Sequence, residues 1–283
     1  MTAEVFDDRR NILGEGPLWH PRLERLFWFD IMGKRLFSRA GGDRQEWTFD
    51  RHVSAAGWVD DSTLLLATER DLISFDILTG ASDVIVPLEA DNPVTRSNDG
   101  RADPNGGFWI GTMGKMADAG AGTIYRYYRG EIRPLYDGIT IPNAICFTPD
   151  GRQACFADTD KRLVWRVALD EDGWPRGEPE IYLDHRAAGI NPDGAVIDAD
   201  GCFVCAEWGG WRVGRYDRGG NLVEEFSVPV EQASCPALAD GILYVTTARQ
   251  GLPEDRIDAQ PQAGMTFRIA TGMTGQQEHQ VIL

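Results

Sequence analysis

Four residues with oxygen-bearing side chains occupy the same position in different copies of a repeating pattern. Oxygen atoms are the ligands that hard divalent cations prefer. Glu15, Asn98, Asn143 and Asp193 each stand seven residues before the same position of a predicted turn. Carboxylates and amides can hold a cation while leaving coordination positions open for water or substrate. The pattern therefore predicts a metal or ligand site.

The turns that define this interval are strong hairpin signals, because glycine after Asn or Asp favours a tight reversal of the chain. Three of them are Pro104-Asn105-Gly106, Pro149-Asp150-Gly151 and Ala199-Asp200-Gly201. A run rich in aromatic and β-branched residues follows each turn, at Phe108–Met113, Gln153–Asp158 and Cys202–Glu207. A third run follows each of these, at Thr123–Tyr128, Leu163–Ala168 and Arg212–Asp217. The chain therefore predicts short antiparallel strands.

The spacing of these units is regular. The glycines of the three turns are 45 and 50 residues apart. Weaker versions of the unit surround Pro21, Asp61 and Asp240, which makes six units of about 47 residues each. Four short strands at this period are typical of a propeller blade, whereas a β-sandwich would explain the strands but not the period. We predict an all-β, six-bladed β-propeller with four-stranded antiparallel blades, as a single domain spanning residues 1–283.

The first strand of a propeller blade lines the central channel, so equivalent positions in different blades meet near the axis. The position seven residues before the turn falls at the beginning of that strand. In the two remaining units Ser54 and Ala233 occupy this position. Each oxygen-bearing residue also suits an ordinary turn, but four of them at one offset favour a central site. We also expect Ala3–Phe6 and Gln280–Leu283 to pair and close the ring.

The charge of the chain argues against some classes of partner. Lys and Arg number 28 against 44 Asp and Glu, a formal net charge of −16, which repels nucleic-acid phosphates and anionic lipid. The opening MTAEVFDDRR lacks the basic and apolar segments of a secretion signal, and no apolar run is long enough to span a bilayer. We expect a cytoplasmic protein with neither nucleic acid nor membrane as a partner.

Other catalytic and metal-binding motifs find little support. The five cysteines form an odd, scattered set, so no disulfide framework is predicted and burial is expected for all five. Cys202 and Cys205 have a metal-binding spacing, but residues three apart on a strand face opposite sides of the sheet. No G-x-S-x-G elbow or zinc-type histidine pair occurs, and His20 is expected to be structural. The acidic residues that end three predicted second strands are expected to be solvated: Asp30, Asp158 and Glu207.

The same residues lie in motifs that resemble the regucalcin (senescence marker protein)/gluconolactonase family. The resemblance covers almost the whole chain in the right order, and its combination of motifs is specific. The motifs are Gly14-Glu15-Gly16-Pro17-Leu18-Trp19, Arg96-Ser97-Asn98-Asp99-Gly100, Pro142-Asn143-Ala144 and Asn191-Pro192-Asp193-Gly194.

The resemblance implies a divalent-metal-dependent lactonase that opens a sugar-acid lactone to the free aldonic acid. It implies one metal ion held by Glu15, Asn143 and Asp193, with Arg96 and Asn98 in contact with the substrate. Asp193 is both a metal ligand and a candidate general base, with water activated by the metal as the alternative. Oxygen ligands suit Ca²⁺, Mg²⁺ and Mn²⁺, and Zn²⁺ or Fe²⁺ can also bind such a set.

Two departures from the family pattern leave the choice of sugar open. Some relatives carry an acidic residue that binds sugar hydroxyls where this chain has Met116, and the last blade has Cys235 in place of a Phe-Gly-Gly stretch. Two other functions fit the same scaffold. One is a metal-dependent phosphotriesterase or aryl-esterase, and the other is a non-catalytic metal-binding propeller.

Overall fold

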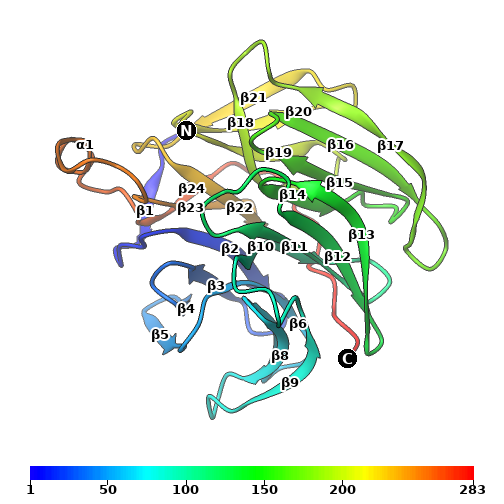
Figure 1. Ribbon diagram of the computed structural model, residues 1–283. Coiled ribbons are helices and arrows are strands. Elements are labelled where there is room, and N and C mark those ends of the chain that lie inside the picture. The colour runs from blue at the N-terminus through cyan, green and yellow to red at the C-terminus, as the bar shows by residue number, and fades with distance from the viewer.

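The computed structural model describes all residues from 1 to 283 and contains six four-stranded antiparallel sheets. The sheets are arranged as a ring around a common centre (Figure 1). The first strand of each sheet contacts the first strands of the neighbouring sheets, so these six strands surround the axis. The prediction of a six-bladed propeller is confirmed.

Blades one to five each use four consecutive strands. Blade one contains β2 (Gly14–His20), β3 (Arg25–Asp30), β4 (Arg35–Ala40) and β5 (Asp43–Thr48). Blade two contains β6 (Val53–Trp58), β7 (Thr63–Thr68), β8 (Asp71–Asp76) and β9 (Ser82–Pro87). Blade three contains β10 (Thr95–Ala102), β11 (Phe108–Gly114), β12 (Gly122–Tyr128) and β13 (Glu131–Ile139). Blade four contains β14 (Pro142–Phe147), β15 (Gln153–Asp158), β16 (Leu163–Leu169) and β17 (Pro175–Asp184). Blade five contains β18 (Asn191–Ile197), β19 (Phe203–Trp208), β20 (Arg212–Tyr216) and β21 (Leu222–Ser227).

The sixth blade joins the two ends of the chain and closes the ring. It contains β22 (Ala233–Ala239), β23 (Ile242–Thr247), β24 (Thr266–Ala270) and, as its outermost strand, β1 (Glu4–Asp7). β1 pairs antiparallel with β24, with Glu4 opposite Arg268. The only helix, α1 (Glu254–Ala259), lies in the connection between β23 and β24. No helix is long and apolar enough to cross a membrane.

The expected pairing of Ala3–Phe6 with Gln280–Leu283 is wrong. The chain after β24 leaves the blade and crosses the ring, as the red segment in Figure 1 shows. Val281 donates its main-chain N–H to the carbonyl of Trp58, and Ile282 donates to that of Gly106, both over 2.9 Å. The C-terminal residues therefore attach to blades two and three, because the edge of β24 is already taken by β1.

The hairpin turns form where the sequence predicts them. Gly106, Gly151 and Gly201 all have positive φ, at 88°, 67° and 83°, a backbone conformation that glycine adopts without steric cost. Each donates its N–H to the carbonyl three residues earlier, over 2.8 to 3.1 Å. These local turns fix the register of the first two strands, and with it the distance from each turn to the axial position.

The core consists of apolar side chains packed between neighbouring blades. Buried residues of blades one and two form one cluster, and those of blades five and six form another of equal size. Four cysteines belong to this buried interior, whereas Cys202 is partly exposed because it lies in the turn before β19. His20 is fully buried, with Nε2 3.0 Å from the carbonyl oxygen of Asp60, so its structural role is confirmed.

Candidate active site

The axial positions lie near the start of the innermost strands, at one end of the channel. Glu15, Asn98, Asn143 and Asp193 stand on β2, β10, β14 and β18 and are only 5%, 7%, 2% and 4% exposed. Ser54, on β6, donates a hydrogen bond from its hydroxyl to the hydroxyl oxygen of Ser97 over 2.8 Å. The structure therefore brings together oxygen-bearing side chains from separate blades, as the common interval predicts.

The innermost strands are irregular where these residues stand. The pairing with the second strand shifts after Glu15 and again after Asn143. The next residues, Gly16 and Ala144, have positive φ of 52° and 56°. A side chain on Gly16 would place its Cβ 2.4 Å from the carbonyl oxygen of Ser54. Such bulges re-aim side chains out of the regular alternation of a strand, which here leaves Glu15 and Asn143 buried at the axis.

A chain of hydrogen bonds connects three blades across the site. Arg96 donates from Nη1 to Oδ1 of Asn98 over 2.9 Å, and Asn98 donates from Nδ2 to Oδ1 of Asn143 over 3.0 Å. Asn143 donates from Nδ2 to the hydroxyl of Thr159 over 2.8 Å. Thr159 in turn donates to the carbonyl of Pro192 over 2.6 Å, next to Asp193. Arg96, Asn98 and Asn143 thus belong to one buried network that ends beside Asp193.

Three buried carboxyl groups interact electrostatically in this region, those of Glu15, Asp99 and Asp193. Burial, and then repulsion from Asp99, raises the pKa of Glu15 to about 8. Burial raises the pKa of Asp99 to about 6. Burial, followed by repulsion from Glu15 and Asp99, also raises the pKa of Asp193. The three groups are close enough to oppose one another's ionisation, and the site favours positive charge.

These residues fit a divalent cation. Neither Glu15 nor Asp193 forms an ion pair, although both are buried carboxyl groups, and buried charges are normally paired or bind metals. No three acidic, histidine or cysteine side chains form a metal-ligand cluster, so an amide oxygen is needed to complete a set of three. Oδ1 of Asn143 suits this role because Nδ2 already points at Thr159.

Arg96 is a cation without a carboxylate partner. It is 5% exposed and its guanidinium bonds only the carbonyl of Ser97 and Oδ1 of Asn98, both through Nη1. Burial lowers its pKa to about 10, opposed by attraction to Glu15. The group stays charged at neutral pH, and the donors on Nε and Nη2 remain free for a ligand.

Several residues outside the predicted site support it. Asp99 contributes a third carboxyl group, and its Oδ2 accepts the main-chain N–H of Ile145 over 2.7 Å. Asp30 and Asp158, expected to be solvated, are 2% and 0% exposed, and so is Glu207 at 2%. The expectation of solvated strand ends is wrong. Asp30 and Asp158 accept main-chain N–H groups of the segments that precede β2 and β14, and Glu207 binds Arg212 and Tyr216 of β20. A clue was available, since Asp30 and Asp158 end the second strands of two repeats and Glu207 stands one residue before the end of a third.

The blade that differs from the family pattern carries no oxygen ligand at the axis. Ala233 occupies its axial position and is fully buried.

Met116, the other departure from the family pattern, lies in the loop after β11 of blade three with 85% of its surface exposed. It offers no hydrogen-bonding group to a sugar, which agrees with the departure noted in the sequence.

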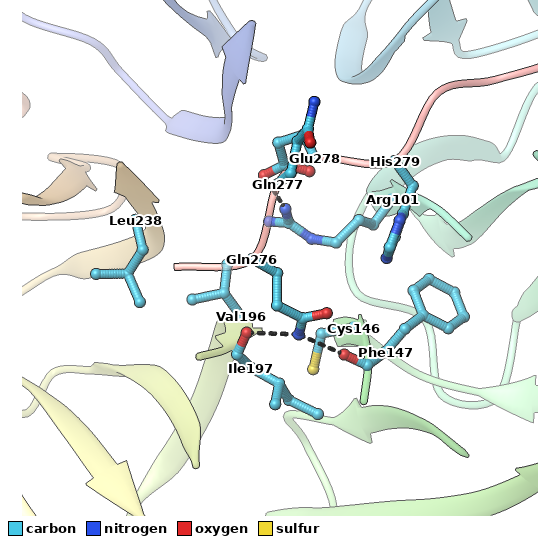
Figure 2. A pocket seen from close by; sticks show the side chains of 10 residues that line it. All are labelled: Arg101, Cys146, Phe147, Val196, Ile197, Leu238, Gln276, Gln277, Glu278 and His279. Carbon is cyan, nitrogen blue, oxygen red and sulfur yellow. Dashed lines mark hydrogen bonds and ion pairs between the residues drawn. The ribbon is translucent and has the colours of Figure 1, made fainter. Parts of the chain in front are cut away.

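The opposite end of the channel is closed by the C-terminal segment (Figure 2). Gln276 donates from Nε2 to the carbonyls of Phe147 and Ile197, at the ends of two innermost strands. Arg101 pairs with Glu278 over 2.6 Å. A cavity of only about 30 Å³ remains between this segment and the strands. It lies at the far ends of these strands, so it is separate from the axial carboxylates.

Comparison with known proteins decides the family. Residues 13–249 match the SMP-30/gluconolactonase/LRE-like region, which is most of the chain and includes every axial residue. The chain belongs to this family. The resemblance found in the sequence is therefore confirmed, and the match covers all six innermost strands.

Individual members of the SMP-30/gluconolactonase family are similar over nearly their whole length. The L-arabinolactonase of Azospirillum brasilense is 36% identical over 96% of this chain and 93% of its own. The pentonolactonase of Haloferax volcanii is 31% identical over 98% and 97%. The crystal structure of a calcium-binding protein, regucalcin, of Agrobacterium tumefaciens has a TM-score of 0.97 at 38% identity, covering 100% of this chain and 98% of its own.

Proposed function

We propose that this protein hydrolyses a sugar-acid lactone to the free aldonic acid, with one divalent cation held by Glu15, Asn143 and Asp193. The observation that carries the proposal is the pair of buried carboxyl groups without a cationic partner, at the axial end where Asn143 also lies. Relatives named L-arabinolactonase and pentonolactonase support a lactone as the substrate. The relative named as calcium-binding supports a divalent cation.

The chain's own groups account for binding and proton transfer. A divalent cation supplies Lewis acidity, which polarises a lactone carbonyl. Asp193 is suited to accept the proton of the attacking water at a carboxylate oxygen, because it is buried with the other axial residues and a carboxylate placed within reach of the water can act as a general base. Water adds to the lactone carbonyl carbon, the ring C–O bond breaks, and the ring oxygen leaves as a hydroxyl group.

Arg96 and Asn98 are suited to hold the substrate. The free N–H groups of Arg96 can donate to a lactone oxygen or to an acidic substituent. Asn98 is already oriented, because Nδ2 donates to Asn143 and to the carbonyl of Pro142. Its Oδ1 accepts from Arg96 and keeps a second lone pair that can accept from a sugar hydroxyl. This fixed geometry favours a polyol lactone over a flat aryl ester.

The test is acid release from a panel of pentono- and hexonolactones, with phosphotriester and aryl-ester probes beside them. The protein is assayed as purified, after chelation, and after addition of Ca²⁺, Mg²⁺, Mn²⁺, Zn²⁺ or Fe²⁺ in turn. Lactone hydrolysis that is lost on chelation and restored by a cation supports the proposal. Turnover of the phosphotriester or aryl ester alone identifies the esterase instead. Cation binding without turnover of any probe identifies a non-catalytic propeller.

A further inference from the structure

We infer that Asp30, Asp158 and Thr159 are positioning residues that hold Glu15, Asn143 and Asp193 in the arrangement a cation needs. We call these three residues the support row. Asp30 and Asp158 end the second strands of blades one and four, and Thr159 follows Asp158 directly. The inference rests on the proposed function, since it assigns a role toward the same cation.

The two aspartates make the same contacts in blades that are far apart in sequence. Asp30 accepts the main-chain N–H groups of Leu13 and Ile12 over 3.0 and 3.1 Å. Asp158 accepts those of Ile141 and Thr140 over 3.1 and 3.0 Å. Leu13 stands two residues before Glu15, and Ile141 stands two residues before Asn143. Each buried carboxylate therefore fixes the backbone that leads to a predicted metal ligand.

These contacts are suited to a positioning role because a hydrogen bond from an N–H group to a carboxylate is stronger than one between neutral groups, and each aspartate makes two of them. They also act beside a short paired stretch. The ladder between first and second strands pairs Gly14 with Asp30 and Pro142 with Asp158, and it breaks after Glu15 and after Asn143. The aspartates extend the constraint of this short stretch to the backbone just before it.

The contact pattern occurs in two of the three blades that carry a proposed ligand and in none of the others. The other second strands end at Thr68, Gly114, Trp208 and Thr247. Thr68 accepts N–H groups of its own following loop, and Thr247 donates to the carbonyl of Met265. A carboxylate that accepts two main-chain N–H groups from the segment before the first strand thus occurs in the two blades that carry Glu15 and Asn143.

Thr159 determines which way the amide of Asn143 faces. Its hydroxyl hydrogen is directed at the carbonyl of Pro192, so its oxygen can only accept toward Asn143. An acceptor there selects Nδ2 of Asn143, which leaves Oδ1 facing the axis and Asn98. The same hydroxyl holds the peptide that precedes Asp193. One side chain thus links a ligand of blade four to a ligand of blade five.

The experiment compares each support-row variant with a matched variant at the other end of the propeller. Thr159→Val removes both hydrogen bonds at nearly constant shape. Its match is Thr148→Val, at the far end of β14, where the hydroxyl bonds Asp150 and Gln153. Asp158→Asn is matched by Asp198→Asn, because Asp198 is 1% exposed, accepts the N–H of Cys202 and pairs with Arg215.

Affinity for Ca²⁺ and Mn²⁺ is measured on the purified full chain by titration calorimetry, with thermal unfolding recorded for every variant. We expect Thr159→Val, Asp30→Asn and Asp158→Asn to weaken cation affinity by about 10- to 100-fold, as loss of hydrogen bonds behind metal ligands commonly does. Thr159→Ser should restore wild-type affinity. Thr148→Val and Asp198→Asn should lower the melting temperature without changing cation affinity.

The outcomes separate this inference from the function on which it rests. Wild-type cation binding together with unchanged affinity in Thr159→Val and Asp158→Asn overturns the positioning role alone. Equal losses of affinity in the support-row variants and their matches also overturn it, since the effect would then be general destabilisation. A wild-type protein that binds no cation and opens no lactone overturns the proposed function, and this inference with it. If Thr159→Val does not fold, Asp158→Asn and Thr159→Ser decide the question.

Discussion

Asn98 donates a hydrogen bond from Nδ2 to Oδ1 of Asn143 over 3.0 Å, and the two residues come from adjacent blades. Both stand at the same position of the repeat, so a symmetric view would give them the same role. Their contacts differ, because Asn98 is held by the cation Arg96 while Asn143 is held by the neutral hydroxyl of Thr159. This asymmetry agrees with the proposal that Asn98 contacts substrate and Asn143 contacts the metal.

Asp193→Ala is expected to abolish most lactone hydrolysis while leaving the propeller folded. The substitution removes a proposed metal ligand together with the candidate base, and loss of a general base alone costs roughly 10²- to 10⁴-fold in rate. The measurement is kcat/KM for lactone opening beside circular dichroism. Near wild-type turnover in a folded variant would refute the role of Asp193.

Glu15→Gln is expected mainly to weaken the affinity for the cation. The amide keeps one oxygen at the axis but removes a negative charge from a group that is 5% exposed, and hard cations prefer charged carboxylates. Cation titration of the purified variant gives the dissociation constant. A constant equal to that of the wild type would show that Glu15 is not a ligand.

Arg96→Ala and Asn98→Ala are expected to lower kcat/KM by roughly ten- to a hundredfold, because each charge-assisted hydrogen bond to substrate contributes about 1.5–3 kcal/mol. Metal content per chain, measured by elemental analysis, should stay near the wild-type value. Arg96→Lys serves as the comparison, since it keeps the charge and loses the planar fork. A substrate with an anionic group should suffer more from Arg96→Ala than a neutral analogue. Loss of metal in Arg96→Ala would contradict this division of roles.

The metal-free protein is expected to become less stable as the pH rises. Glu15 has an ordinary pKa of 4.5 and a pKa of about 8 in the folded chain. A raised pKa means that stability is complete below the ordinary value and is lost as pH rises through the folded value. Asp193 shifts in the same direction. Melting temperatures of chelated protein should fall by roughly 10 °C between about pH 5 and pH 8.

Divalent cations should reverse this pH dependence, because they compensate the ionised carboxylates and stabilise only the folded state. The rise in melting temperature on adding a cation should therefore grow with pH. Asp193→Ala provides the control, since part of the repulsion is removed with its carboxyl group. A metal-free protein whose melting temperature is flat or rising over this range would contradict the assigned shifts.

Glu278→Ala is expected to lower the free energy of unfolding by about 3 kcal/mol, because it leaves the charge of Arg101 without a partner in a mostly buried place. Arg101 and Glu278 are 12% and 11% exposed in their side chains. Denaturant unfolding measures the change. Glu46→Ala is the matched variant, since the Arg35–Glu46 pair is 45% and 41% exposed and should contribute under about 1 kcal/mol. Equal effects of the two substitutions would show that the buried Arg101–Glu278 pair stabilises the fold no more than an exposed pair does.

The sequence by itself determined the strands, the turns and the axial positions. β15 begins and ends at the residues predicted from local composition, and β11 and β16 begin at theirs. This succeeded because a hairpin turn and the alternation along a strand are encoded within a few neighbouring residues. The position of Glu15 relative to its turn follows from the same local geometry, repeated around the ring.

Only the tertiary structure decided how distant segments meet. It paired β1 with β24, it laid Gln276 and Glu278 across the far end of the channel, and it buried Asp158 against the N–H groups of Thr140 and Ile141. Each of these contacts joins groups whose partner lies in another element, so no local pattern specifies it. The orientation of the Asn143 amide is the clearest case, because it depends on a hydroxyl that is itself held by a carbonyl of the next blade.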